Sequence, residues 1–172
     1  MGEQPGSLLS GRHSVPLSEG EAERASNTFL ALDDKVNVRH EPGARTVFRV
    51  VEIEGRECGE IVFGSDIYPG DNIVDPNAAV TLTGAAAHEL THYYRWQDKS
   101  ALGDGELRHI DEALTSLEAI CRYARQLNDT DVRTLVGDAI VRLKMFVHEQ
   151  RKGDARPVAA TPPVESTEIG PH

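Results

Sequence analysis

Apolar residues in the second half of this 172-residue chain recur at the spacing of an α-helix. The clearest run lies between Asp131 and about Gln150, where the apolar residues share one face of the predicted helix. They are Val132, Leu135, Val136, Ala139, Ile140, Leu143, Phe146 and Val147. A chain of this length suits one hydrophobic core. The pattern therefore predicts a helix packed against the core of a single domain.

Three more helices are predicted before this one. The sequence after Asp75 begins a helix because the aspartate can cap free amides and Pro76 needs no N–H at the first position. We expect that helix to end near Gln97. Another spans residues 106–128, and a short one lies within residues 17–36, where Ser18 can act as its cap.

Residues 46–67 follow a different pattern. Two β-rich runs, Thr46–Ile53 and Gly59–Ile67, flank a turn that contains Gly55, and the sequence YPGD follows them. This pattern predicts a β-hairpin. The expected fold class is therefore α+β, with a small hairpin or sheet followed by a bundle of three helices.

The ends of the chain lack a periodic apolar signal. We expect a flexible segment over residues 1–17, a single domain over residues 18–150 and a disordered tail over residues 151–172. The N-terminus has neither the basic start nor the apolar run of a signal peptide. No stretch approaches the ~20 apolar residues of a membrane span. These features predict a cytoplasmic protein.

Composition excludes several classes of function. The net charge of -10 and the absence of a basic run argue against nucleic acid as a partner. Two cysteines, Cys58 and Cys121, are too few for a disulfide framework. We expect no nucleic-acid and no membrane partner, whereas a homo-oligomer or a regulatory protein partner is compatible with the sequence.

The stretch GAAAHELTHYYRW holds an H-E-x-x-H motif, with His88 and His92 four residues apart. On a helix these side chains lie one turn apart on the same face, so both imidazoles can bind one metal ion. Glu89 is at the edge of that face, where it can hold a metal-bound water without occupying the metal. The pattern indicates a zinc site, with a solvated polar helix face as the alternative.

A catalytic zinc needs three protein ligands and one open position. Glu112 is the preferred third ligand because it lies opposite the apolar stripe of its helix, on a face of small residues. Asp98, Asp111 and Glu118 remain alternatives. The expected architecture therefore packs the H-E-x-x-H helix against a helix that bears a glutamate.

With these residues the chain resembles the gluzincin class of zinc metallopeptidases, and the small bacterial single-domain members in particular. In that class a second helix supplies a glutamate about twenty residues after the motif, which is the position of Glu112. The resemblance implies a hydrolase that binds Zn²⁺ through His88, His92 and Glu112, with Glu89 as general base. It also implies that an extended protein or peptide substrate binds at a sheet edge beside the motif helix.

The sequence departs from the class at two positions. Ser116 stands where larger gluzincins often have an aspartate that orients a zinc histidine, and Thr91 replaces a common glycine. Peptide deformylases share the H-E-x-x-H motif and would use Cys58 as a ligand, but the sequence around Cys58 is not their motif. The resemblance implies a class of enzyme and leaves its substrate open.

The expected function is zinc-dependent hydrolysis of a peptide bond. Four residues are candidates for polarising the substrate carbonyl beside the metal: Tyr93, Tyr94, His109 and Tyr123. One alternative is a metal-stabilised binding or adaptor module that hydrolyses nothing, for which His109 would be the fourth ligand. Another is a helical interaction protein without a metal.

Overall fold

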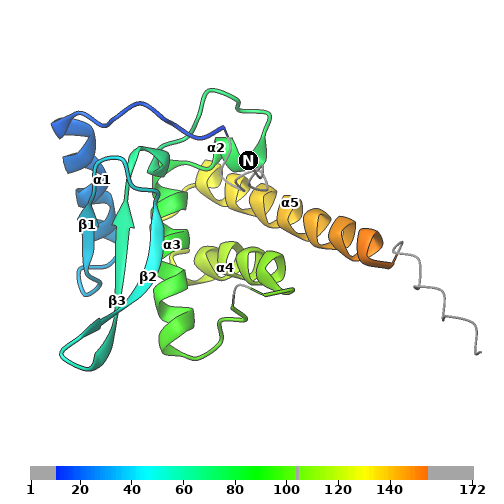
Figure 1. The fold of residues 1–172 in the computed structure, drawn as a ribbon. Helices are drawn as coiled ribbons and strands as arrows, with labels where there is room; N and C mark the ends of the chain where they lie inside the picture. Colours follow the sequence, from blue (N-terminus) through cyan, green and yellow to red (C-terminus); the bar gives the residue numbers. More distant parts are fainter. Residues whose placement is uncertain (1–10, 104, 155–172) are drawn as a thin grey trace, which may run out of the picture.

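Residues 11–103 and 105–154 are described by the computed structural model, and they form an α+β fold with five α-helices and a three-stranded sheet. The predicted fold class is confirmed at this level. The elements, in chain order, are α1 (Glu19–Leu32), β1 (Val38–His40), β2 (Val47–Ile53), β3 (Arg56–Phe63), the 3₁₀ helix η1 (Ser65–Ile67), α2 (Pro76–Ala79), α3 (Leu82–Gln97), α4 (Arg108–Arg122) and α5 (Asp129–Asp154) (Figure 1).

The sheet has the strand order β1-β3-β2, so β2 is an edge strand. The predicted hairpin is present as β2 and β3, which pair antiparallel around Glu54 and Gly55. Both turn residues have positive φ angles, 52° and 76°, as a two-residue type I′ turn requires. The predicted end at Ile67 is wrong because Ser65–Ile67 forms η1. The short strand β1, parallel to β3, was not predicted.

The single helix predicted from Asp75 to about Gln97 is two helices in the structure. Asp75 does cap α2, but Val80 has an extended ψ of 123° and ends that helix after one turn. Thr81 then caps α3, because its side chain accepts a hydrogen bond from the amide of Gly84. Because of this break, α2 and α3 are separate helices.

The two C-terminal helices differ from their predicted lengths. α4 begins at Arg108 and ends at Arg122, so it is shorter than the predicted 106–128. α5 runs to Asp154, so residues 151–154 of the expected disordered tail are helical. The rest of that tail lies outside the described residues.

Arg12 belongs to the segment that we expected to be flexible, yet its side chain is buried. Its guanidinium donates hydrogen bonds to four backbone carbonyls, those of Asp66, Ile67, Asn77 and Val80. These bonds join the N-terminal segment to η1 and α2. The expectation of flexibility is therefore wrong at Arg12, and residues 1–10 lie outside the described residues.

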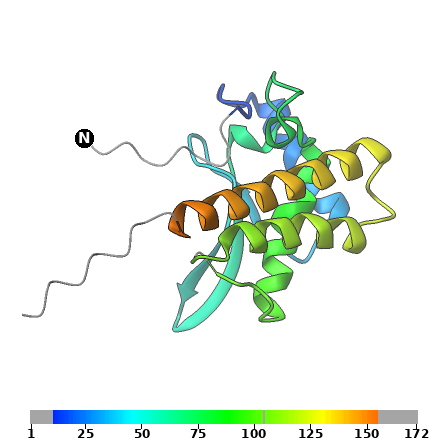
Figure 2. The ribbon, with the colours of Figure 1, turned by 90° about the vertical axis from the view of Figure 1, so that its right-hand side faces the viewer.

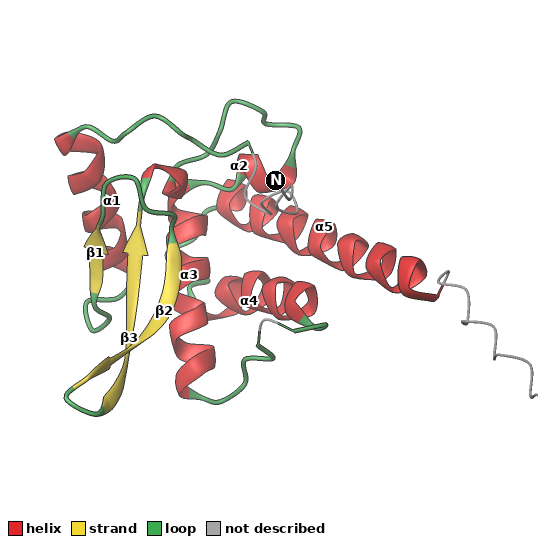
Figure 3. Ribbon diagram, in the orientation of Figure 1, coloured by secondary structure: helices red, strands yellow, loops and turns green. Residues whose placement is uncertain are grey.

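α3 lies between the sheet and the helix pair α4–α5 (Figure 3). It packs against α1, β2 and β3 on one side and against α4 and α5 on the other. The core holds Phe29 of α1, Ile61 and Phe63 of β3 and Leu90 of α3, all fully buried. Among the described residues, no helix combines the length and apolar character that crossing a bilayer requires.

Candidate metal centre

His88 and His92 lie on the side of α3 that faces α4, opposite the buried Leu90. Their Nε2 atoms are 3.0 Å apart, and the side chains are only 12% and 17% exposed. The spacing of one helical turn places both rings over the same point. The pair is therefore shielded from solvent and presents two nitrogen ligands side by side.

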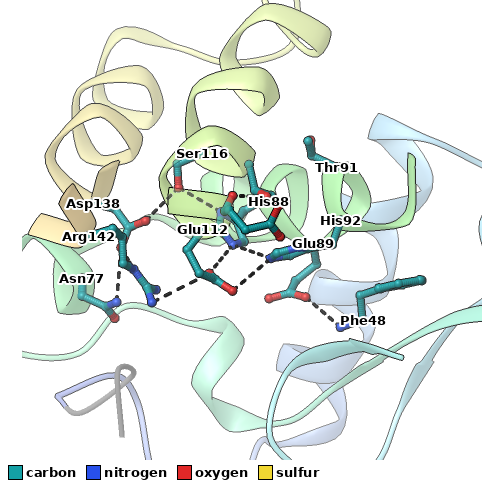
Figure 4. A network of polar contacts seen from close by, with 12 residues as sticks. Phe48, Asn77, His88, Glu89, Thr91, His92, Glu112, Ser116, Asp138 and Arg142 are labelled. Carbon is teal, nitrogen blue, oxygen red and sulfur yellow. Dashed lines mark hydrogen bonds and ion pairs between the residues drawn. The ribbon is translucent and has the colours of Figure 1, made fainter. Parts of the chain in front are cut away.

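Glu112 of α4 completes a group of three ligand atoms (Figure 4). Its Oε2 lies 3.2 Å from Nε2 of His88, and its Oε1 lies 3.5 Å from Nε2 of His92. Tetrahedral zinc with ligands at 2.0–2.2 Å places neighbouring ligand atoms about 3.3–3.6 Å apart. The three separations of 3.0, 3.2 and 3.5 Å are at or slightly below this range, and nitrogen and oxygen are donor types that zinc accepts.

The charges at this group favour a cation. Burial raises the pKa of Glu112, but hydrogen bonds from His88 and His92 lower it by more, so the carboxyl has a pKa far below its usual range. Burial lowers the pKa of His92, but its contacts with Glu112 outweigh this effect and raise it. A partly exposed, ionised carboxylate thus faces two imidazoles that can accept either protons or a metal.

A hydrogen-bonded chain supports His88 from behind. Its Nδ1 lies 2.9 Å from Oγ of Ser116, and the serine hydroxyl donates to Oδ2 of Asp138 at 2.7 Å. Because the hydroxyl proton is used on Asp138, the serine oxygen accepts from the Nδ1–H of His88. With a metal bound, Nε2 would carry no proton, and its lone pair would point to the metal. Ser116 thus links the histidine to a carboxylate on α5.

Arg142 of α5 is the cation nearest the third ligand among the described contacts. Only 5% of its side chain is exposed, and its Nε donates to Oδ1 of Asp138 at 3.2 Å. Its terminal nitrogen Nη1 lies 3.7 Å from Oε2 of Glu112. Asn77 donates to the same Oδ1 of Asp138 at 3.2 Å. The guanidinium is therefore held in place at the wall of the site.

Glu89 lines the same cleft as the three ligands, and its carboxylate reaches toward β2 (Figure 4). Its Oε2 accepts a hydrogen bond of 2.9 Å from the backbone amide of Phe48 in β2. The bond uses only one oxygen of the carboxylate. It also fixes the edge strand beside the H-E-x-x-H helix.

A cleft of about 850 Å³ contains the site. Its lining includes Val47, Phe48, Arg49 and Val50 of β2, the motif residues His88, Glu89 and His92, and Glu112, Asp138 and Arg142 from the helix pair. One wall is thus an edge strand and the other is formed by α4 and α5.

The three alternative ligands do not face the histidines. Asp98 is exposed and lies 3.6 Å from Arg122. Asp111 accepts from Arg95 at 2.7 Å, and Glu118 accepts from the same arginine at 3.0 Å. The structure brings Glu112, and none of these three, into the group with His88 and His92.

The other candidates named from the sequence also have partners elsewhere. The hydroxyl of Tyr94 donates to Asp33, and that of Tyr93 accepts from Gln97. His109 is fully buried and meets Glu149 at 3.0 Å. The hydroxyl of Tyr123 is buried without a partner among the described residues, and Cys58 is outside the group of ligands. None of these residues lines the cleft as described.

Sequence reasoning missed Asp138, Arg142 and the amide of Phe48. Asp138 and Arg142 stand four residues apart beside the apolar stripe of their helix. Opposite charges at this spacing indicate an ion pair on one side of a helix. The amide of Phe48 carries no side-chain signal at all. A comparison with known protein families, with curated proteins and with solved structures finds no match to this chain.

Proposed function

We propose that this protein is a zinc-dependent metallopeptidase of the gluzincin type, with His88, His92 and Glu112 as ligands. The observation that carries the proposal is the group of three ligand atoms, spaced 3.0, 3.2 and 3.5 Å apart at the base of a cleft. Two features distinguish this site from a structural zinc site. Glu89, a candidate general base, is next to a ligand in the sequence. A structural site would also have a fourth protein ligand, and no fourth residue joins the group among the described residues.

Each residue has a role that its position supports. Zinc, when bound, would lower the pKa of a water to about 7 and polarise a carbonyl. Glu89 would take a proton from the attacking water on the carboxylate oxygen that Phe48 does not engage and pass it to the leaving amine. Arg142 is the cation placed to stabilise negative charge on the substrate.

The proposed substrate is an extended segment of a protein or peptide. β2 is an edge strand, and residues 47–50 line the cleft, so its backbone is available for strand addition. The amide of Phe48 is already bonded to Glu89, so pairing would use the backbone beyond it. The open cleft is consistent with a chain that passes across the site.

The first test is zinc content after purification without chelators. We expect near one zinc per natural chain and a sharp reduction in Glu112→Gln. The matched control is Glu118→Gln, a change on the same helix at a carboxylate bonded to Arg95 and Arg122. Circular dichroism confirms that each variant is folded. An unchanged zinc content in Glu112→Gln would contradict the assigned ligand.

The second test separates catalysis from zinc binding. Glu89→Gln keeps the zinc ligands, so we expect it to retain zinc but to hydrolyse a quenched-fluorescence peptide library about 10²–10⁴-fold more slowly. Zinc in the natural chain without any hydrolysis would favour a metal-stabilised binding module. A natural chain that takes up no zinc would exclude both readings and leave a helical interaction protein.

A further inference from the structure

The apolar side of α4 faces away from the core. Leu107, at the N-cap of α4, and Leu114 and Leu117 within it are 41–45% exposed, although leucine is a large apolar residue. The opposite side is buried and carries Asp111 and Ser116 together with small residues. α4 thus turns its polar side inward to build the network around the site, and its leucines remain exposed among the described residues.

The neighbouring helix α5 also leaves apolar residues exposed. Val136, Ile140, Leu143 and Val147 are 37–46% exposed. The two helices lie side by side, and their outer sides face the viewer in Figure 2. We call the surface formed by these four residues with Leu107, Leu114 and Leu117 the α4–α5 face. Monomeric proteins rarely leave so many large aliphatic side chains together on one face.

The α4–α5 face has the spacing of a helix-packing seam. On α4 the apolar positions are 107, 110, 114, 117 and 121, and on α5 they are 136, 140, 143 and 147. Alternating steps of three and four residues are the a and d positions of a coiled coil. Such positions pack into the side chains of other helices with the same repeat. A helical partner with the same repeat would fit this surface.

We propose that the α4–α5 face binds a second copy of this chain, so that two helix pairs form a four-helix bundle. Each copy supplies two helices with the required repeat. A twofold axis would place the apolar positions of one copy against those of the other. None of the nine seam positions is charged, so two chains of net charge -10 can meet there without opposing like charges.

The size of the face agrees with this occupant. A stable interface uses about 20–30 residues on each partner. α4 and α5 have 15 and 26 residues, and about half of each helix, on the order of 20 residues together, faces outward. The cleft opens on the inner side of the helix pair, where Glu112 and Arg142 lie, so the contact leaves it accessible.

The chain's own remaining segments fit the face less well. Residues 1–10 and 155–172 contain few large aliphatic residues, namely Leu8, Leu9, Val158, Val164 and Ile169. None of them stands at the repeat of three and four, and residues 155–172 include four prolines, which interrupt helices. A second copy supplies what these segments lack.

The test is the mass of the natural chain in solution, measured by light scattering during size-exclusion chromatography. We expect about twice the 18.8 kDa of one chain. Leu117→Glu and Ile140→Glu place a charge on the face and should each halve the mass. Leu30→Glu is the matched control, because Leu30 is 58% exposed on α1, outside the face, and its variant should remain a dimer.

Circular dichroism of each variant separates loss of the dimer from loss of the fold. A natural chain that is monomeric at about 100 μM, far above a micromolar dissociation constant, overturns the proposal. If removal of residues 155–172 then produced dimers, we would conclude that this segment, rather than a second copy, covers the α4–α5 face. A dimer that persists in both Leu117→Glu and Ile140→Glu also overturns it, because the contact would lie elsewhere. None of these outcomes depends on zinc.

Discussion

The hydroxyl oxygen of Ser116 lies 2.9 Å from Nδ1 of His88 and, because it donates to Asp138, accepts a hydrogen bond from the Nδ1–H. A serine can hold a histidine tautomer only if its own proton has another acceptor, and here that acceptor is a carboxylate on α5. The candidate metal centre therefore depends on three helices, although its ligands come from two.

Removal of this hydroxyl should weaken metal binding. We expect Ser116→Ala to lower zinc affinity about 10–100-fold, because the Nδ1–H of His88 loses its acceptor. Asp138→Asn should have a similar effect, and the double variant should be little worse than either single variant, since both changes break one chain of hydrogen bonds. Competition with a chromophoric chelator measures the affinities.

A neighbouring hydroxyl provides the control for this prediction. Thr115 is buried on the same helix, and its hydroxyl donates only to the backbone carbonyl of Asp111. Thr115→Val should therefore leave zinc affinity unchanged. Equal losses in Thr115→Val and Ser116→Ala would show that general packing of α4, rather than the bond to His88, controls the affinity.

The stability of the protein should depend on pH through Glu118. Burial raises the pKa of this carboxyl, but hydrogen bonds from Arg122 and Arg95 outweigh that effect and lower it. A lowered folded-state pKa gives stability that is present above the unfolded pKa, about 4.3, and is lost as the pH falls through the folded value. We expect Glu118→Gln to be about 1 kcal/mol less stable at neutral pH.

Urea unfolding at a series of pH values measures this difference. The gap between the natural chain and Glu118→Gln should close as the pH falls below about 4. Glu57→Gln serves as the control, because Glu57 is exposed on β3 and should show no such gap. A gap of the same size at every pH would mean that the ionisation of Glu118 is not its cause.

The N-terminal segment should contribute to stability through Arg12. Burial lowers the pKa of Arg12 to about 10, yet its guanidinium donates to four carbonyls. Arg12→Ala leaves those carbonyls without their donor, so we expect a loss of about 3 kcal/mol or more. Thermal unfolding measures it. Arg24→Ala, at an exposed position of α1, should change the midpoint little, and equal effects of the two variants would refute the assignment.

A side chain at position 59 should lower the stability of the protein. A Cβ there would lie 2.9 Å from ring atoms of both Phe48 and Tyr93 and 3.0 Å from Trp96, where the hairpin packs on α3. Gly59→Ala should therefore destabilise the protein by about 1–3 kcal/mol. Gly20→Ala, in an open position of α1, should instead be neutral or stabilising. Chemical denaturation compares the two, and a neutral Gly59→Ala would disprove this close packing.

Local sequence determined much of the secondary structure, because caps and turns act over a few residues. Ser18 forms a capping box with Glu21, and Asp75 caps α2 as its position before Pro76 indicates. The hairpin follows from β-rich runs around Gly55. The break at Thr81 was missed because a threonine inside a helical pattern signals a cap only when the chain before it is extended.

Helical spacing alone placed His88 and His92 on one face, and the stripe of α4 placed Glu112 opposite its leucines. Which side of α4 turns inward was a question of tertiary structure, because an isolated helix carries no information about its neighbours. Burial of the polar side leaves the leucines exposed.

The contacts of Ser116 with Asp138 and of Glu89 with Phe48 join residues 22 and 41 positions apart. Periodicity and spacing describe one element at a time, so they cannot predict pairs whose members lie on different elements. The sequence by itself determined most of the elements and the side chains available to a metal. Only the packing of α3 between the sheet and α4–α5 decided which of those side chains meet.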